Sequence, residues 1–334
     1  MLDRLTSPRL DWIQVEVSSH CNALCAYCPR TVHHRAWISR HLPLSDFERL
    51  APAFARTRMV HLQGWGEPLL HPELLTMIRL AKDAGCVVGT TTNGTRLDPH
   101  LAGELVASGI DVVAISLAGV DARNDAIRRG APLDGVVDAL RRLDAAKVAA
   151  ASSTPAIHAA HLLLRSRIAD VDEFARFYAP LPVSEIVVST LDCVPSSALA
   201  DEVIAPASAD EHESLAARLE AAKAALSDHG KTLHYRLVHP QAPRAGCAEN
   251  AGRSLYVSAA GGVAPCVFTS LPLRPGTPAA GIGITAPRQC SFGNVHAARL
   301  GTIWRSADYR AFRAAFAQGR VPAACGDCPK AALA

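Results

Sequence analysis

Short β-branched runs alternate with amphipathic stretches of helical period from residue 12 to about residue 189. This alternation is typical of parallel β/α units, in which the helix after each strand packs on the sheet and returns the chain to its starting edge. Six such strands in series predict an α/β fold with a partial (β/α)6 barrel of the TIM type. The candidate strands span residues 12–17, 58–63, 86–91, 111–116, 157–164 and 185–189.

Helix signals separate these candidate strands. The predicted helices 46–55, 73–84 and 99–108 begin at Ser, Asp or Pro residues, which favour a helix N-terminus. Gly85 and Gly109 follow the second and third of these helices, where a left-handed residue commonly ends a helix. Because the carboxyl ends of parallel strands lie on one face of a barrel, we expect the loops that follow the strands to meet there and to carry the functional side chains.

The chain changes character in its last third. A strand predicted at 233–238 is followed by a Pro- and Gly-rich region, a hairpin predicted over 254–266 and a final helix predicted over 302–318. The aromatic side chains of that helix recur at helical spacing and are expected to pack in the core. We therefore predict a barrel domain over residues 1–230 and a separate, metal-stapled appendage, a β-hairpin plus a helix, over residues 231–334.

Composition narrows the functional classes. The 334 residues are 49% hydrophobic and 19% charged, as in a globular protein. Lysine and arginine total 34 against 31 aspartates and glutamates, so no positive excess marks a nucleic-acid or anionic membrane surface. No window of about twenty strongly apolar residues predicts a membrane span, and no signal peptide is recognisable. A cytoplasmic protein is expected, and ten cysteines in that reducing compartment indicate metal or redox chemistry.

Three cysteines stand close together directly after the first candidate strand, at Cys21, Cys25 and Cys28. Thiolates at this C-x3-C-x2-C spacing can hold three irons of an iron–sulfur cube and leave the fourth iron without a protein ligand. Zinc sites favour pairs such as C-x2-C completed to four ligands, and a zinc site or unconnected buried thiols are the alternatives. With Tyr27 before the last cysteine, the run resembles the signature of the radical S-adenosylmethionine (SAM) enzymes. That resemblance implies a SAM-binding 4Fe–4S cluster at the triplet.

Motifs after the later strands resemble those of the same family. Gly66-Glu67-Pro68 follows the second strand and resembles the family's GEP motif, which implies a site for the amino group of SAM; a simple turn is the alternative. Asn93 lies in a Thr- and Gly-rich segment at the end of the third strand, and Ser116 lies at the end of the fourth. Small polar side chains at these positions suit hydrogen bonds to a ribose or a carboxylate.

An arginine fork is well suited to the carboxylate of SAM. The resemblance favours Arg129, after the fourth strand, over Arg165, at the end of the fifth, and a solvated surface arginine is the alternative. It also implies that Tyr27 flanks the adenine, with the backbone near residues 187–189 as the other wall. The 14 histidines show no convincing metal-ligand spacing, and we do not expect them to be catalytic.

A second group of cysteines lies in the C-terminal region. Their arrangement resembles the SPASM and twitch extensions of radical SAM enzymes, but they are too few for the two clusters of a full SPASM domain. The twitch type implies one auxiliary 4Fe–4S cluster, held by Cys247, Cys266, Cys325 and Cys328. Cys290 is an extra thiol, which we favour, or replaces one of the four, and a four-cysteine zinc site is the alternative. Full cysteine ligation implies an electron carrier.

The resemblance as a whole implies a radical SAM oxidoreductase. Such an enzyme cleaves SAM reductively to a 5′-deoxyadenosyl radical that abstracts a substrate hydrogen, with flavodoxin or ferredoxin as electron donor and the auxiliary cluster as electron acceptor. Only about eleven residues precede the first strand, so we expect no peptide-recognition domain there and favour a small-molecule substrate such as a sugar or an aminocyclitol. A peptide-modifying enzyme that crosslinks or epimerises is the second hypothesis, and a non-catalytic iron–sulfur or zinc protein is the third.

Overall fold

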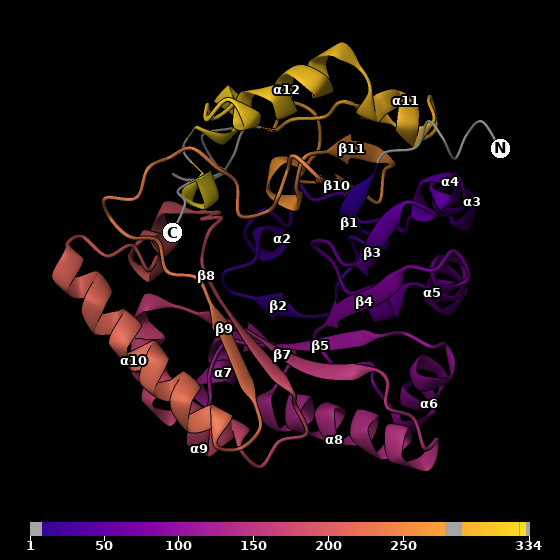
Figure 1. The fold of residues 1–334 in the computed structure, drawn as a ribbon. Helices are drawn as coiled ribbons and strands as arrows, with labels where there is room; N and C mark the ends of the chain where they lie inside the picture. The colour runs from indigo at the N-terminus through magenta and orange to yellow at the C-terminus, as the bar shows by residue number, and fades with distance from the viewer. Residues whose placement is uncertain (1–8, 278–288, 327, 332–334) are drawn as a thin grey trace.

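A ten-stranded sheet forms the frame of the protein (Figure 1), with the strand order β12-β11-β10-β1-β3-β4-β5-β7-β8-β9. The structure is a computed structural model that describes residues 9–277, 289–326 and 328–331. Every neighbouring pair from β10 to β9 is parallel, and β11 and β12 continue the sheet antiparallel. The strands are β1 (Leu10–Val15), β3 (Thr57–Leu62), β4 (Val87–Thr92), β5 (Val112–Leu117), β7 (Ala156–Leu163), β8 (Glu185–Thr190), β9 (Thr232–Tyr235), β10 (Ser254–Val257), β11 (Gly262–Ala264) and β12 (Gly293–Asn294).

The partial barrel predicted from the sequence is confirmed. The six expected strands are β1, β3, β4, β5, β7 and β8, and each lies within two residues of its expected bounds. Strand β9 adds a further parallel strand at the edge of the sheet by pairing with β8. Since β9 lies after residue 230, the sheet continues across the domain boundary that we expected there.

Helices cover the outer face of the sheet (Figure 1), as the β/α alternation predicts. In α8, the buried residues Val136, Ala139, Leu140 and Leu143 recur at three- and four-residue spacing, which places them on one face of the helix. The helices are α2 (Pro29–Val32), α3 (Leu44–Glu48), α4 (Ala51–Phe54), α5 (Leu74–Asp83), α6 (Pro99–Ala107), α7 (Arg123–Ile127), α8 (Leu133–Ala149), α9 (Phe174–Tyr178), α10 (Ala209–Ser227), α11 (Leu300–Trp304) and α12 (Ala307–Ala317). Within the described residues, none of the helices combines the length and the apolar character that crossing a bilayer requires.

Two predicted helices are each divided in two. The helix expected over 46–55 forms α3 and α4, and Pro52, which has no amide hydrogen, lies in the first turn of α4. The helix expected over 302–318 forms α11 and α12. Helix α11 ends with Arg305 as its C-cap, and Ser306 caps α12 by accepting a hydrogen bond from Tyr309 N at 3.3 Å. Local capping and proline signals therefore overrode the longer periodic pattern in both places.

The C-terminal region joins the barrel sheet. Strand β10 pairs in parallel with β1, and β10 and β11 form the predicted hairpin. Helices α11 and α12 lie over this end of the molecule, at the top of Figure 1. Their aromatic residues pack in the core as predicted, since Tyr309 is fully buried and its ring stacks on that of Phe292 at 4.0 Å. The appendage is thus an extension of the sheet, and its hairpin lies directly beside the first barrel strand.

Candidate functional site

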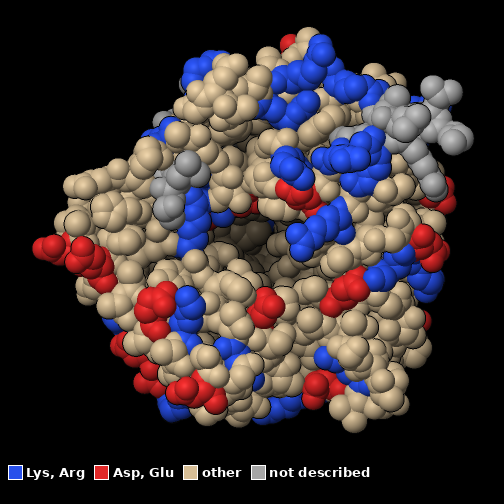
Figure 2. Space-filling model, viewed as in Figure 1, with Lys and Arg blue, Asp and Glu red and all other residues tan. Residues whose placement is uncertain are grey.

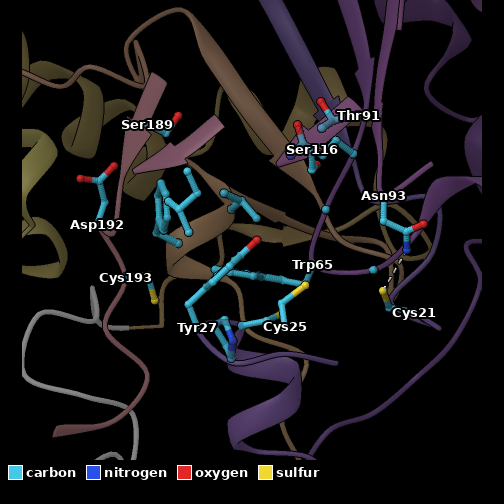
Figure 3. A pocket seen from close by; sticks show the side chains of 18 of the residues that line it. Cys21, Cys25, Tyr27, Trp65, Thr91, Asn93, Ser116, Ser189, Asp192 and Cys193 are labelled. Carbon is cyan, nitrogen blue, oxygen red and sulfur yellow. Dashed lines mark hydrogen bonds between the residues drawn. The ribbon is translucent and has the colours of Figure 1, made fainter. Parts of the chain in front are cut away.

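A cavity of about 430 Å³ lies at the carboxyl ends of the barrel strands. Figure 2 shows the molecule hollowed near its centre. The strands contribute polar side chains to the cavity, namely Gln14 from β1, Thr91 from β4, Ser116 from β5 and Ser189 from β8; Figure 3 labels the last three. Successive side chains of a strand point to opposite faces, and Gln14, for example, lies between the fully buried Ile13 and Val15. The β/α pattern predicted this convergence of strand ends.

The cysteine triplet Cys21, Cys25 and Cys28 borders this cavity. Arg30 holds the loop that carries the triplet, because its Nη2 donates hydrogen bonds to the carbonyl oxygens of Cys21 at 2.6 Å and Ala23 at 2.7 Å. All three thiols are free. Among the described residues, no three Cys, His, Asp or Glu side chains converge as the ligands of a single metal ion do. The triplet presents its three sulfur donors to a shared cavity.

Burial disfavours the charged form of two of these thiols, those of Cys21 and Cys28. It raises the pKa of Cys28 to about 12 and also raises the pKa of Cys21. A thiolate ligand in such a position needs a nearby positive charge, which iron provides in a cluster. Three free sulfur donors beside a cavity with room for a further ligand therefore fit a cluster with one open iron.

The glycine of the GEP motif is required by close packing. A Cβ on Gly66 would lie 2.3 Å from the carbonyl oxygen of Ser18 and 2.4 Å from that of His20. The next residue, Glu67, donates its backbone N–H to the same His20 carbonyl at 2.7 Å. Gly66 and Glu67 line the cavity, whereas Pro68 is buried and is not among the lining residues. The motif thus packs its backbone against the segment that leads into Cys21.

The carboxylate of Glu67 serves to hold the loop in place. It is buried and accepts hydrogen bonds from the Thr92 hydroxyl at 2.6 Å, from Asn93 N at 2.7 Å and from Leu69 N at 3.0 Å. Burial raises the pKa of Glu67, and these hydrogen bonds oppose the shift. The carboxylate therefore ties the GEP loop to the end of β4.

Asn93 connects the end of β4 to the cysteine loop. Its Nδ2 donates to Asn22 Oδ1 at 2.9 Å and lies 3.8 Å from Cys21 Sγ, the contact dashed in Figure 3. Its Oδ1 accepts hydrogen bonds from the N–H and the hydroxyl of Thr95. These contacts order the cavity wall near the triplet.

The structure brings Arg128, and not the expected Arg129, to the cavity. Arg128 is buried, lines the cavity and donates from Nη1 to the hydroxyl oxygen of Tyr27 at 2.8 Å, whereas Arg129 is exposed. Both arginines lie in the short strand β6 (Arg128–Arg129), which pairs with β2 (Leu24–Cys25), and adjacent strand residues point to opposite sides. Arg165 donates to the carbonyl oxygens of Val203 and Ala205 and is not among the lining residues. Of the two neighbouring arginines, Arg128 and not Arg129 lines the cavity, and the assignment of either one to SAM stays a prediction.

The four expected auxiliary cysteines line a second, small cavity: Cys247, Cys266, Cys325 and Cys328. Burial raises the pKa of Cys325 to about 12 and also raises the pKa of Cys266 and Cys328. Cys290 is not among the residues that line this cavity, although its charge also acts on the Cys325 thiol. The donor set of four thiols fits a cluster ligated entirely by cysteine.

The two cavities share a wall. Glu249, Phe268 and Lys330 line both of them. Lys330 Nζ lies 2.9 Å from Glu249 Oε1 and 3.0 Å from Asp192 Oδ2, and Asp192 belongs to the segment after β8. Burial opposes the charge of Lys330, but the two carboxylates outweigh it and raise the pKa of its ammonium group. The sequence analysis did not predict this group of charges, because Asp192 and Glu249 are 57 residues apart in the chain and Glu249 and Lys330 are 81 residues apart.

Charges in this wall act on the auxiliary thiols. Burial has the largest effect on the pKa of Cys328 and raises it, whereas a hydrogen bond from the amide of Lys330 lowers it. The negative charge of Asp192 raises this pKa further, and the positive charge of Lys330 lowers it. Cys193, next to Asp192, also borders the larger cavity and is almost fully buried. Figure 3 shows Asp192 and Cys193 on the far side of the cavity from Asn93 and Cys21.

Glu16 connects the GEP loop to the C-terminal hairpin and was also missed. This carboxylate, directly after β1, is fully buried and accepts hydrogen bonds from Trp65 N at 2.9 Å and from Ala259 N at 3.0 Å. Burial raises its pKa to about 6. A lone acidic residue at the end of an apolar strand was the available sequence signal, since a buried carboxylate needs such partners.

Comparison with known families matches both halves of the chain. The sequence model described as Radical SAM superfamily matches residues 15–160, which include the triplet and the cavity-lining residues at the ends of β3, β4 and β5. The model described as an iron-sulfur cluster-binding domain, SPASM, matches residues 247–329, which include the four auxiliary cysteines.

Individual proteins extend this similarity. The tungsten-containing aldehyde ferredoxin oxidoreductase cofactor-modifying protein of Pyrococcus furiosus is 26% identical over 186 residues, 54% of this chain and 52% of that protein. Mycofactocin maturase MftC of Mycobacterium tuberculosis is 29% identical over 177 residues, 51% of this chain and 43% of that protein. The chain therefore spans about half the length of the curated relatives it matches. The crystal structure of Streptococcus suis SuiB bound to S-adenosylmethionine has the same fold, with a TM-score of 0.68 at 13% identity over 92% of this chain and 68% of SuiB.

Proposed function

This chain belongs to the radical SAM superfamily and carries a C-terminal SPASM-type iron–sulfur domain, and from that premise we propose that it oxidatively modifies a peptide. The observation that carries the proposal is the pair of cysteine-lined cavities that share one wall, because a radical-generating site in the larger cavity would then lie beside an electron acceptor in the smaller one. The substrate class, the single auxiliary cluster and the oxidative outcome are the parts that we propose.

Cys21, Cys25 and Cys28 would hold the SAM-binding 4Fe–4S cluster. Bound there, the cluster would supply the one electron that cleaves SAM reductively to methionine and a 5′-deoxyadenosyl radical. A flavodoxin or ferredoxin is the reductant that we propose. The protein's own task is to orient SAM and the substrate and to keep water away from the radical.

We assign each chemical group of SAM to different residues of the larger cavity. Since the carboxylate of Glu67 is taken up by its own hydrogen bonds, we assign the amino group of SAM to the backbone of the Gly66–Glu67 segment. Arg128 replaces Arg129 as the partner of the SAM carboxylate, because its buried Nε finds no hydrogen-bond acceptor in the described protein. Asn93 and Ser116 are available to the ribose, and Tyr27 flanks the adenine opposite the end of β8.

One auxiliary cluster, held by Cys247, Cys266, Cys325 and Cys328, would close the second cavity. Fully ligated by cysteine, such a cluster supplies an acceptor for one electron. A substrate that gave up a hydrogen atom to the radical, then a proton to solvent and an electron to this acceptor, would be oxidised by two electrons. Because the substrate would be oxidised by two electrons, we propose that the enzyme is a radical SAM oxidoreductase.

Several observations favour a peptide over a sugar or an aminocyclitol. The relatives do not support sugar oxidation, and they include a protein named as a maturase. SuiB, which shares this fold, has been crystallised with its precursor peptide SuiA. The cavity of about 430 Å³ lies near the lower end of the ~300–1,000 Å³ of sites that bury one drug-sized ligand. With SAM bound, the remaining space suits one side chain of a peptide that stays largely outside.

Co-expression tests the peptide substrate directly. The chain is produced with the short peptides encoded beside its gene, and each peptide is analysed by mass spectrometry. We expect one peptide to lose two hydrogen atoms, and we expect no change with a control chain in which Cys21, Cys25 and Cys28 are alanine. Unchanged peptides, together with sugar-dependent release of 5′-deoxyadenosine by the purified enzyme, would overturn the peptide assignment and restore the small-molecule hypothesis.

Radical generation is tested separately. Anaerobically reconstituted and reduced protein is mixed with SAM, and 5′-deoxyadenosine is measured by liquid chromatography. Its release excludes a non-catalytic iron–sulfur or zinc protein. Absence of release from protein that contains its iron would refute the proposed function.

A further inference from the structure

The charged wall between the two cavities has a built geometry of its own. Asp192, Glu249 and Lys330 come from three separate segments and meet at the Lys330 ammonium, which contacts both carboxylates within 3.0 Å. Glu249 and Lys330 face both cavities, and Asp192 faces the larger one. Figure 3 shows Asp192 at the edge of that cavity. The group therefore stands between the substrate space and the auxiliary cysteines.

The ammonium group is fixed in position. The Lys330 side chain is 20% exposed and that of Asp192 is 14% exposed, so solvent screens their interaction only weakly. Thr190 donates its hydroxyl to Asp192 Oδ1 at 2.9 Å, which orients the carboxylate toward the lysine. Lys330 Nζ also lies 5.5 Å from the ring centre of Phe268, which lines both cavities. A lysine is usually a mobile point charge, but here contacts hold it on more than one side.

We propose that the Lys330 ammonium, positioned by Asp192 and Glu249, raises the reduction potential of the auxiliary cluster and thereby favours electron acceptance from the substrate. This inference rests on the proposed function. Reduction adds a negative charge to the cluster, so a fixed positive charge beside it stabilises the reduced form and a negative charge destabilises it. Lys330 and Asp192 should therefore move the potential in opposite directions, which a merely structural role for the group would not do.

The test measures the potential of the auxiliary cluster alone. Cys21, Cys25 and Cys28 are replaced by alanine, so that the remaining cluster gives the only signal, and an anaerobic redox titration is followed by electron paramagnetic resonance. We expect Lys330→Met to lower the midpoint potential, because it removes the positive charge and leaves two carboxylates. Asp192→Asn should raise the potential, and Lys330→Arg, which keeps the charge, should shift it least.

Equal potentials in all variants, or shifts of the same sign for Lys330→Met and Asp192→Asn, overturn the inference. Iron content and melting temperature are measured for each variant. If the Lys330→Met variant loses its cluster, the Asp192→Asn variant alone tests the inference. A midpoint potential of that variant that is lower than or equal to the parent's then overturns the inference. A parent that binds zinc instead of iron overturns it as well. The proposed radical generation is judged independently, by 5′-deoxyadenosine release from protein with the triplet intact.

Discussion

The two cysteine-rich regions of this protein differ in the cavities that their cysteines line. The N-terminal triplet borders a cavity of about 430 Å³ that also collects polar side chains from the ends of several strands. The C-terminal four, Cys247, Cys266, Cys325 and Cys328, line a much smaller cavity walled by protein. Three ligands beside open space suit a cluster that binds a cosubstrate, and four ligands in a closed space suit one that exchanges electrons.

The contrast follows from where each region lies in the fold. The triplet is on a loop at the carboxyl end of a barrel strand, where parallel topology leaves space for a ligand. The auxiliary cysteines are carried by segments around the hairpin that extends the sheet beside β1. One sheet therefore supports both regions, and buried groups such as Glu16 connect them.

The largest expected effect tests the triplet. Replacing Cys21, Cys25 and Cys28 with alanine removes all three sulfur donors, and we expect 5′-deoxyadenosine release to fall to the background of iron-free protein. Cys86→Ala is the matched control, because Cys86 is buried, bonds only to the carbonyl oxygens of Phe54 and Thr57 in the described structure and lies outside both cavities. Equal loss of activity in the control would mean that the effect is on folding.

A tenfold to hundredfold effect is expected at Arg128. Arg128→Met removes a charged hydrogen-bond donor worth about 1.5–3 kcal/mol, so the dissociation constant of SAM should rise by roughly 10- to 100-fold. Arg129→Met is the control, and we expect a change of less than about twofold because this neighbour is exposed. Anaerobic equilibrium dialysis measures both. The opposite ranking of the two variants would restore Arg129 as the partner of the carboxylate.

The buried Glu16, which connects the two regions, should make the stability of the folded protein depend on pH. Burial raises its pKa from 4.5 to about 6, so the folded protein binds the proton more tightly than the unfolded chain does. This contribution to stability is complete below pH 4.5 and is lost as the pH rises through about 6, at a cost on the order of 2 kcal/mol. The free energy of unfolding, measured by denaturant titration from pH 4 to 8, should lose this component in Glu16→Gln. A pH profile identical to that of the parent would show that Glu16 does not titrate in this range.

The smallest effect on radical generation is expected at the auxiliary cysteines. The double variant Cys325→Ala, Cys328→Ala should lose about four irons per chain yet change 5′-deoxyadenosine release by less than about threefold, because SAM is cleaved at the other site. Cys290→Ser should leave the iron content unchanged. Iron loss in Cys290→Ser would make Cys290 a ligand, and complete loss of SAM cleavage in the double variant would show that the two regions are not separable.

Much of the fold was predictable because its signals are local. The period of two in β7 and the period near 3.6 in α8 follow from residues a few positions apart, as does the spacing of the triplet. Arg128 could not be chosen over Arg129 in this way, since a short strand can present either neighbour to the cavity. The longer apolar pattern predicted single helices over 46–55 and 302–318, but the local signals of Pro52 and Ser306 prevailed in the structure.

The sequence by itself determined the β/α order, the two groups of cysteines and, through them, the radical SAM family. Only the tertiary structure decided that β10 pairs with β1, that Arg128 faces the cavity and that Lys330 meets Asp192 and Glu249. The physical reason is range. Periodicity and motif spacing are encoded within a few residues, whereas a contact between residues 192 and 330 exists only once the segment after β8 and the C-terminal segment have packed together.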